Sequence, residues 1–305
     1  MKPTLFVILG PTGVGKTELS LKIAQELSTS IISSDSRQIY QAMKIGTAAP
    51  TPEQLKLVNH FFIGQRPLDS TYSAGQYEEE ALPIIAQEIK QHNAALLVGG
   101  SMLYIDAVCK GMDQIPTTDP EVRALVQEEY AKGDDDKMRG ILKMVDPELY
   151  KSIDLKNMKR VLHALEVYYQ NGIPLSQLQT GQIKNRPFSI VKIGLDRPRA
   201  ELFERINQRV ALMMEEGLEQ EARTLYPFKD YNALNTVGYK ELFNYFDGVW
   251  DKETAIQKIG RNTRWYAKKQ LTWFKKDESI HWFHPKEEDA ILNFIKQTKW
   301  YKSYL

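Results

Sequence analysis

Residues 10–17 of the chain read Gly10-Pro11-Thr12-Gly13-Val14-Gly15-Lys16-Thr17. This run fits the pattern G-x-x-x-x-G-K-S/T of a phosphate-binding loop, or P-loop. It directly follows the β-rich run 4–9 and opens the segment 16–27, whose apolar residues recur at helical spacing. The glycines let the backbone wrap around an anion, and the helix N-terminus adds positive potential. We therefore expect Lys16 to neutralise bound phosphate and Thr17 to ligate a phosphate-bound Mg²⁺ ion.

The segments that follow the P-loop alternate strand and helix signals. Further β-rich runs occur at 31–32, 60–63 and 94–98, and a helical pattern covers 76–92. This alternation predicts an α/β fold, in which helices flank a parallel sheet.

From 119 to 179 the chain shows only helical stretches, and a strand signal returns once, at 189–195. A late strand that rejoins the sheet favours an insertion over a second tandem domain. We therefore expect a P-loop NTPase-like catalytic core made of residues 1–116 and 187–305, interrupted by a small all-helical domain at 117–186.

Composition narrows the class of protein. Of the 305 residues, 42% are hydrophobic, which is enough to build cores and excludes a mainly disordered chain. The net charge of +1 excludes a globally basic nucleic-acid binder but allows a local basic patch. The single cysteine, Cys109, excludes a disulfide within the chain and fits a reducing compartment. The apolar runs 5–9 and 94–98 are too short to cross a bilayer, so we expect a cytoplasmic protein without membrane contact.

The acidic residue that usually accompanies a P-loop is missing from its usual place. An ordinary P-loop ATPase also holds Mg²⁺ through a carboxylate that ends a buried strand. Here the strand 94–98 ends in Gly99-Gly100, and the strand-end carboxylate is instead Asp35. Either Asp35 is the acid of the metal shell, or the site does something other than hydrolyse a nucleotide.

A basic, aromatic segment lies near the C-terminus. Residues 258–276 contain seven Lys or Arg and no acid, with aromatic residues interleaved. On a helix, one side would carry Arg261, Arg264, Lys268 and Lys275. This pattern suits an RNA backbone with splayed bases. The alternative is a solvated basic face whose aromatic side chains pack in the core.

Two weaker signals are interpreted structurally. The acidic run 134–136 is a solvated loop or a helix start, and His281 and His284 lie in an apolar segment where packing is favoured over metal binding.

Several blocks together resemble the family of tRNA dimethylallyltransferases, and they are collinear over essentially the whole chain. They read SDSRQIY at 34–40, IGTA at 45–48, LVGGSMLY at 97–104, VGY at 237–239 and AKKQLTWF at 267–274. The resemblance implies transfer of a dimethylallyl group from its diphosphate to N6 of the adenosine beside the anticodon in tRNA, with Mg²⁺. The P-loop would then hold a diphosphate leaving group, which explains the missing strand-end acid.

The resemblance also implies roles for particular residues. Asp35 matches the base that takes a proton from N6, and Lys16 and Arg209 match cations on the diphosphate. Ser101 stands where a threonine beside the bridging oxygen is usual. The positions that match tRNA contacts are Asp35, Ser36, Arg37, Gln38, Ser101, Arg123, Lys159, Arg160, His163, Gly238, Tyr239, Lys240, Arg264, Lys268, Lys269 and Gln270. His163 replaces a usual arginine. The partner would be the anticodon stem-loop, and a tRNA-sized substrate favours a monomer with no obligate protein partner.

Two other classes of function remain open from the sequence. One is a P-loop kinase or a prenyltransferase that acts on free adenine nucleotides, although a mononucleotide needs neither the insertion nor the basic segment. The other is a non-catalytic, nucleotide-dependent RNA-binding module. This alternative is disfavoured because Lys16, Thr17 and Asp35 are all intact.

Overall fold

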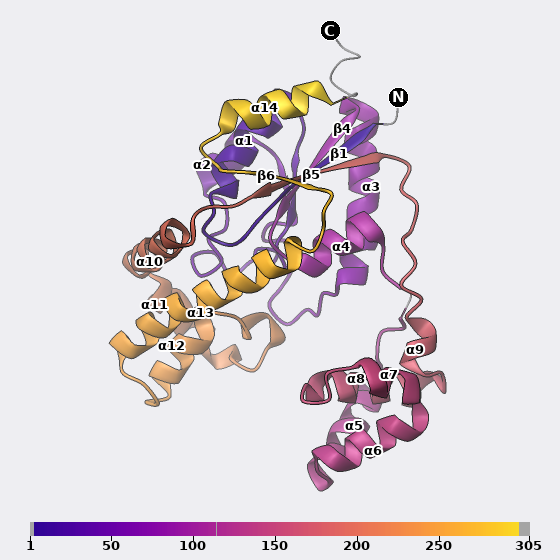
Figure 1. Ribbon diagram of the computed structural model, residues 1–305. Helices are drawn as coiled ribbons and strands as arrows, with labels where there is room; N and C mark the ends of the chain where they lie inside the picture. The colour runs from indigo at the N-terminus through magenta and orange to yellow at the C-terminus, as the bar shows by residue number, and fades with distance from the viewer. Residues whose placement is uncertain (1–2, 114, 299–305) are drawn as a thin grey trace. The chain divides into compact units, whose positions relative to one another are not determined.

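The computed structural model describes residues 3–113 and 115–298, and its centre is one six-stranded sheet (Figure 1). The strands are β1 (Thr4–Leu9), β2 (Ile31–Ser34), β3 (His60–Phe61), β4 (Ala94–Gly99), β5 (Ser189–Leu195) and β6 (Ile280–Phe283). They lie in the order β3-β2-β4-β1-β5-β6, and every neighbouring pair is parallel. The expected α/β class with a parallel sheet is confirmed.

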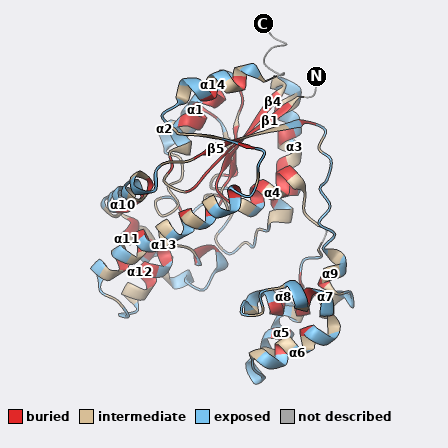
Figure 2. Cartoon of the chain, in the orientation of Figure 1, coloured by how far each residue is buried: buried red, intermediate tan, exposed pale blue. Residues whose placement is uncertain are grey.

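Helices cover both faces of the sheet. Outside the insertion they are α1 (Lys16–Leu27), α2 (Pro52–Leu57), α3 (Ala74–His92), α4 (Met102–Lys110), α10 (Arg199–Glu215), α11 (Leu218–Leu225), α12 (Tyr239–Phe246), α13 (Lys252–Phe274) and α14 (Glu288–Gln297). Alternate residues of a strand point to opposite faces. On β1, Leu5 and Val7 join the core beneath α3 and α4, whereas Phe6 and Ile8 join the core beneath α1 and α14. Figure 2 accordingly shows the central strands as buried.

Parallel strands bring their carboxyl ends to one edge of the sheet, where ligands bind in such folds. β1 ends at the P-loop, β2 ends just before Asp35, and β4 ends just before Gly100 and Ser101. The sheet therefore collects the expected site residues from three separate parts of the sequence.

The insertion forms a compact unit of its own, from Lys110 to Lys184. Its helices are α5 (Pro120–Lys132), α6 (Asp135–Val145), α7 (Pro147–Ser152), α8 (Met158–Asn171) and α9 (Leu175–Leu178). It begins and ends earlier than the expected 117–186. The backbone N–H of Lys184 donates to the carbonyl of Lys110 at 2.7 Å, so the two ends meet there. Arg186 already belongs to the core, because its guanidinium donates to the Val108 carbonyl and pairs with Glu78.

Two elements near the C-terminus were absent from the sequence-based expectation. The segment around His281 forms β6, which pairs with β5, and α14 follows it. His281 packs its ring against Phe294 with centroids 4.6 Å apart. Asp134 proves to be a helix start, since its side chain accepts from Lys137 N at the beginning of α6. Among residues 3–113 and 115–298, no helix is long and apolar enough to cross a membrane.

Candidate active site

The P-loop adopts a backbone that only glycine accommodates well. Gly13 and Gly15 have φ angles of +80° and +105°, a region that side chains disfavour. A Cβ on Gly13 would also lie 2.8 Å from Ile206. The loop closes on its own lysine, because Lys16 Nζ donates to the carbonyls of Gly10 and Pro11 at 2.9 Å each.

Two cations and one carboxylate interact electrostatically beside this loop. Burial lowers the pKa of Lys16 to about 8, although Asp35 raises it and Arg209 lowers it further. Burial likewise lowers the pKa of Arg209, against the opposing charge of Asp35. Desolvated cations of this kind gain most when a polyanion arrives. The arrangement is therefore suited to binding a diphosphate.

Asp35 is partly exposed at the end of β2, and the backbone of the turn that follows it orients its carboxylate. Its Oδ1 accepts from the N–H groups of Arg37 at 2.9 Å and Gln38 at 3.3 Å. Among the residues that the structure describes, no donor bonds its Oδ2. One carboxylate oxygen therefore holds the turn while the other remains available to accept a proton.

Two cavities meet at Asp35. The first, about 630 Å³, is lined by polar, aromatic and apolar residues of α10, α12 and α13 and of the loops beside them. The second, about 1020 Å³, is lined by the P-loop, residues 43–55 and part of α10. Six residues line both cavities: Thr12, Asp35, Thr47, Arg209, Met213 and Tyr266. A ligand in either cavity would thus reach the same carboxylate.

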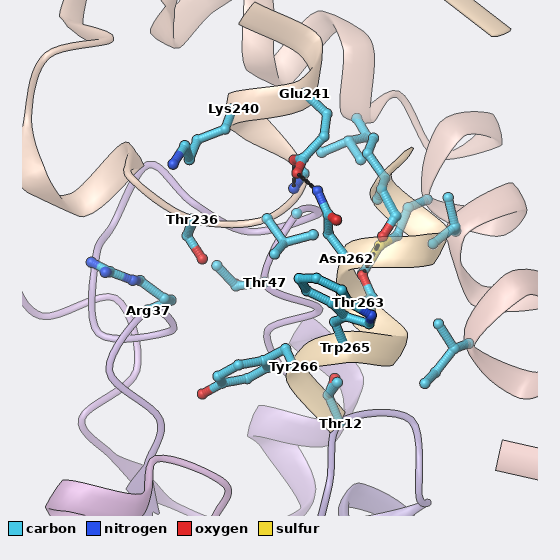
Figure 3. Close-up of a pocket in the computed structure, with 18 of the residues that line it drawn as sticks. Thr12, Arg37, Thr47, Thr236, Lys240, Glu241, Asn262, Thr263, Trp265 and Tyr266 are labelled. Carbon is cyan, nitrogen blue, oxygen red and sulfur yellow. Dashed lines mark hydrogen bonds between the residues drawn. The ribbon is translucent and has the colours of Figure 1, made fainter. Parts of the chain in front are cut away.

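The first cavity extends from the P-loop toward α12. Figure 3 shows Thr12 and Tyr266 at one end and Lys240 and Glu241 at the other. Glu241 accepts from Asn262 at 2.7 Å, which joins α12 to α13. Arg37 also lines this cavity, and its guanidinium donates to the Asn232 carbonyl at 3.2 Å.

The second cavity is lined by apolar side chains as well as by cations. Apolar residues that line it include Met43, Ile45, Ala48, Leu55, Leu212 and Met213. Gln38 shapes this wall, because its amide donates to the carbonyls of Thr47 and Ala48 at 3.1 Å each. A ligand with a charged end and a short hydrocarbon end would match these surroundings.

Ser101 links two of the converging loops. It is 8% exposed, and its Oγ accepts from Ser36 N at 2.8 Å while its own N–H donates to the Ser34 carbonyl. Its neighbour Gly100 lines the second cavity. The Ser101 hydroxyl can still donate one hydrogen bond to a further oxygen.

Two residues expected to contact RNA are buried. Gln270 is 2% exposed, and its amide accepts from Thr12 N at 2.9 Å and donates to the Gly100 carbonyl at 2.8 Å. Tyr239 is fully buried, and its hydroxyl donates to Glu221 at 2.7 Å. Burial, followed by the charge of Glu221, raises the pKa of Tyr239. Both side chains hold loops of the site together.

The basic face of α13 is partly occupied by neighbouring side chains. Arg264 donates to Asn207, Lys268 lies 5.5 Å above the Phe203 ring, and Lys275 pairs with Asp196 at 2.9 Å. Lys240 and Lys269 are exposed, and both line the first cavity together with the buried Gly238. Lys275 therefore has a structural partner that the helical pattern did not show.

In the helical unit the expected contacts lie on α5 and α8. Lys159, Arg160 and His163 are exposed on successive turns of α8. The buried carboxylate of Glu166 lies 3.5 Å from Arg123 Nε and 3.6 Å from His163 Nδ1, which brings these two together.

Sequence reasoning missed two residues that organise the site. Glu221 on α11 accepts from the N–H groups of Lys44, Ile45 and Gly46 at 2.9–3.0 Å, and so holds the loop that walls both cavities. Arg197 donates to the Val14 carbonyl in the P-loop at 2.7 Å. Neither belongs to a local motif, because each contacts residues more than 170 positions away in the chain.

The donor set near Thr17 fits a magnesium ion that arrives with its ligand. Among the described residues there is no group of three or more His, Cys, Asp or Glu able to hold a metal. Thr17 lines the second cavity beside Lys16. Mg²⁺ keeps several waters and commonly binds through few protein oxygens together with substrate phosphates.

A parallel sheet with a P-loop after its central strand β1 makes this an α/β protein of the P-loop class. The sequence profile of the IPP transferase family matches residues 38–277. The chain belongs to the IPP transferase family.

Comparisons over nearly the full length agree with this assignment. The chain is 57% identical to tRNA dimethylallyltransferase 1 of Bacteroides fragilis over 293 residues, which are 96% of this chain and 97% of that protein. The full-length tRNA isopentenylpyrophosphate transferase of Bacillus halodurans superposes with a TM-score of 0.71 at 35% identity, covering 96% of each chain. A eukaryotic dimethylallyltransferase acting on tRNA gives a TM-score of 0.80 at 23% identity, over 96% of this chain and 79% of that one, and shows the shared fold.

Proposed function

We propose that the protein transfers a dimethylallyl group from dimethylallyl diphosphate to N6 of the adenosine adjacent to the anticodon in tRNA. The observation that carries this proposal is the meeting of the two cavities at Asp35. The P-loop cavity has cations and an apolar wall for a prenyl diphosphate. The cavity at α12 and α13 has polar, basic and aromatic side chains for a nucleobase and its phosphates.

In this reaction the N6 nitrogen attacks the allylic carbon, the carbon–oxygen bond breaks, and diphosphate leaves with the electron pair. Asp35 Oδ2 takes the N6 proton, and Oδ1 keeps the carboxylate oriented. Lys16 and Arg209 stabilise the charge that develops on the leaving group, and the Ser101 hydroxyl donates a hydrogen bond beside it. Mg²⁺, held through Thr17 when diphosphate is bound, would neutralise further phosphate charge.

We further propose that residues 110–184 form a tRNA-binding domain, which contacts the anticodon stem-loop through Arg123, Lys159, Arg160 and His163. On the core, Arg37, Lys240, Arg264 and Lys269 would face the same RNA. We propose that the protein acts as a monomer.

The test follows the prenyl group. Purified protein is incubated with labelled dimethylallyl diphosphate and Mg²⁺, together with unmodified tRNA or AMP. We expect label in tRNA, at the adenosine beside the anticodon. Label only in AMP would make the acceptor a free nucleotide, and label in neither would refute the proposed donor.

A further inference from the structure

Arg197 lies between β5 and α10 and contacts the P-loop. It lines a small cavity beside Gly15 and is absent from the lining of the second cavity, which holds Lys16 and Thr17. Its side chain is 7% exposed, and its Nε donates to the Val14 carbonyl at 2.7 Å. Its Nη1 pairs with Glu201, one turn further along α10. The second oxygen of Glu201 lies 3.2 Å from His284 Nε2, directly after β6. The guanidinium is thereby held by the Val14 carbonyl and by Glu201, and His284 in turn contacts Glu201.

This contact constrains the peptide that joins Val14 to Gly15. The described chain contains no cis peptide bond, and in a trans peptide the C=O of one residue and the N–H of the next point in opposite directions. A carbonyl drawn toward Arg197 therefore turns the Gly15 N–H away from Arg197. Gly15 has φ +105°, and a Cβ there would lie 3.3 Å from Arg197 Nη2, so the glycine also permits the close approach.

We propose that Arg197 is a positioning residue for the donor: it orients the Gly15 N–H toward the diphosphate without touching the ligand, and Glu201 keeps Arg197 in place. The inference rests on the proposed function only in taking the P-loop ligand to be a prenyl diphosphate. A preorganised N–H costs no reorganisation when the anion binds.

The test is a calorimetric titration of the full-length protein with inorganic diphosphate in excess Mg²⁺. Arg197→Lys keeps the charge but cannot bond Val14 and Glu201 together as a planar guanidinium does. We expect this variant to bind diphosphate about tenfold more weakly, equivalent to about 1.4 kcal/mol. If Arg197 acted only through its charge, the lysine variant would bind like the wild type.

A second variant separates orientation from charge independently of the first. Glu201→Ala removes a negative charge near the P-loop, so electrostatics alone predicts tighter diphosphate binding. If Glu201 instead keeps Arg197 oriented, the variant should bind diphosphate at least about twofold more weakly, which corresponds roughly to losing part of one hydrogen bond. Wild-type or tighter binding by Glu201→Ala would overturn the proposal.

Arg199→Gln is the matched control. Arg199 is exposed on the same segment, and its guanidinium lies 5.1 Å above the Phe203 ring instead of contacting the P-loop. We expect this variant to leave diphosphate affinity unchanged. In turnover, Arg197→Lys should raise the KM for dimethylallyl diphosphate but not the KM for tRNA. If the wild type does not bind diphosphate, or if Lys16→Ala binds it equally well, the proposed donor site fails and the role of Arg197 fails with it. Diphosphate binding that depends on Lys16 but is unchanged by Arg197→Lys and Glu201→Ala overturns this inference alone.

Discussion

Gln270 provides a direct test of how the site is assembled. This side chain of α13 is 2% exposed and bonds both Thr12 N, in the loop after β1, and the Gly100 carbonyl, in the loop after β4. A Cβ on Gly100 would lie 2.4 Å from the Gln270 amide nitrogen, which shows how closely the two pack. Gln270→Ala removes both bonds at once.

The loss of stability expected for Gln270→Ala follows from the surroundings of the two backbone groups that Gln270 bonds. The bond to the Gly100 carbonyl is buried, and losing it leaves an unpaired acceptor at a cost of about 1–3 kcal/mol. Thr12 lines both cavities, so water can reach its N–H, and the cost there is about 0.5–1.5 kcal/mol. We expect Gln270→Ala to lower the free energy of unfolding by about 1.5–4.5 kcal/mol in total.

The assay compares denaturant unfolding of Gln270→Ala with that of Gln257→Ala. Gln257 is exposed on the same helix, and its amide donates to Glu253 at 3.3 Å, so its removal should cost little. We also expect weaker diphosphate binding by Gln270→Ala, with unchanged tRNA affinity. An unchanged unfolding curve with a clear loss of tRNA affinity would refute this reasoning and make Gln270 an RNA contact.

Three further predictions concern the reaction, the charge of the P-loop and the RNA. Asp35→Asn retains an oxygen for the N–H groups of Arg37 and Gln38, so the fold should be unchanged while the single-turnover rate falls about 10²–10⁴-fold; a near-normal rate would exclude Asp35 as the base. Because burial lowers the pKa of Lys16 to about 8, the cation is present below that pH and lost above it. The kcat/KM for dimethylallyl diphosphate should therefore fall above about pH 8, and Lys16→Arg should remove that decline; a flat wild-type profile to pH 9.5 would contradict it. Arg264→Ala should weaken tRNA binding and reduce its logarithmic salt slope by about 0.7–0.9, as expected for one lost phosphate contact, and an unchanged slope would leave Arg264 with only its bond to Asn207.

Local patterns were sufficient for the sheet and the P-loop. The P-loop could be found from sequence because its positive φ angles require glycine at fixed positions. The strand before it and the helix after it adjoin it in the chain, so this context is also visible in the sequence. Strands 4–9 and 94–98 were predictable because parallel strands covered on both faces form nearly continuous apolar runs. Strand 189–195 was predictable from its β-branched residues Ile190, Val191 and Ile193. β6 was not predicted because it is a four-residue edge strand in which only Ile280 is buried, and its partner β5 lies far away in the chain.

What only the tertiary structure decided is which side chains line the two cavities and which hold the loops. The sequence by itself grouped Tyr239 and Gln270 with the RNA contacts, because both stand in blocks shared with the family. The structure buries them against Glu221 and the P-loop, and it brings Arg197 to Val14. Such contacts join residues far apart in the chain, so no local spacing encodes them. They exist because the parallel sheet gathers its strand ends at one edge, where each buried polar group must find a partner.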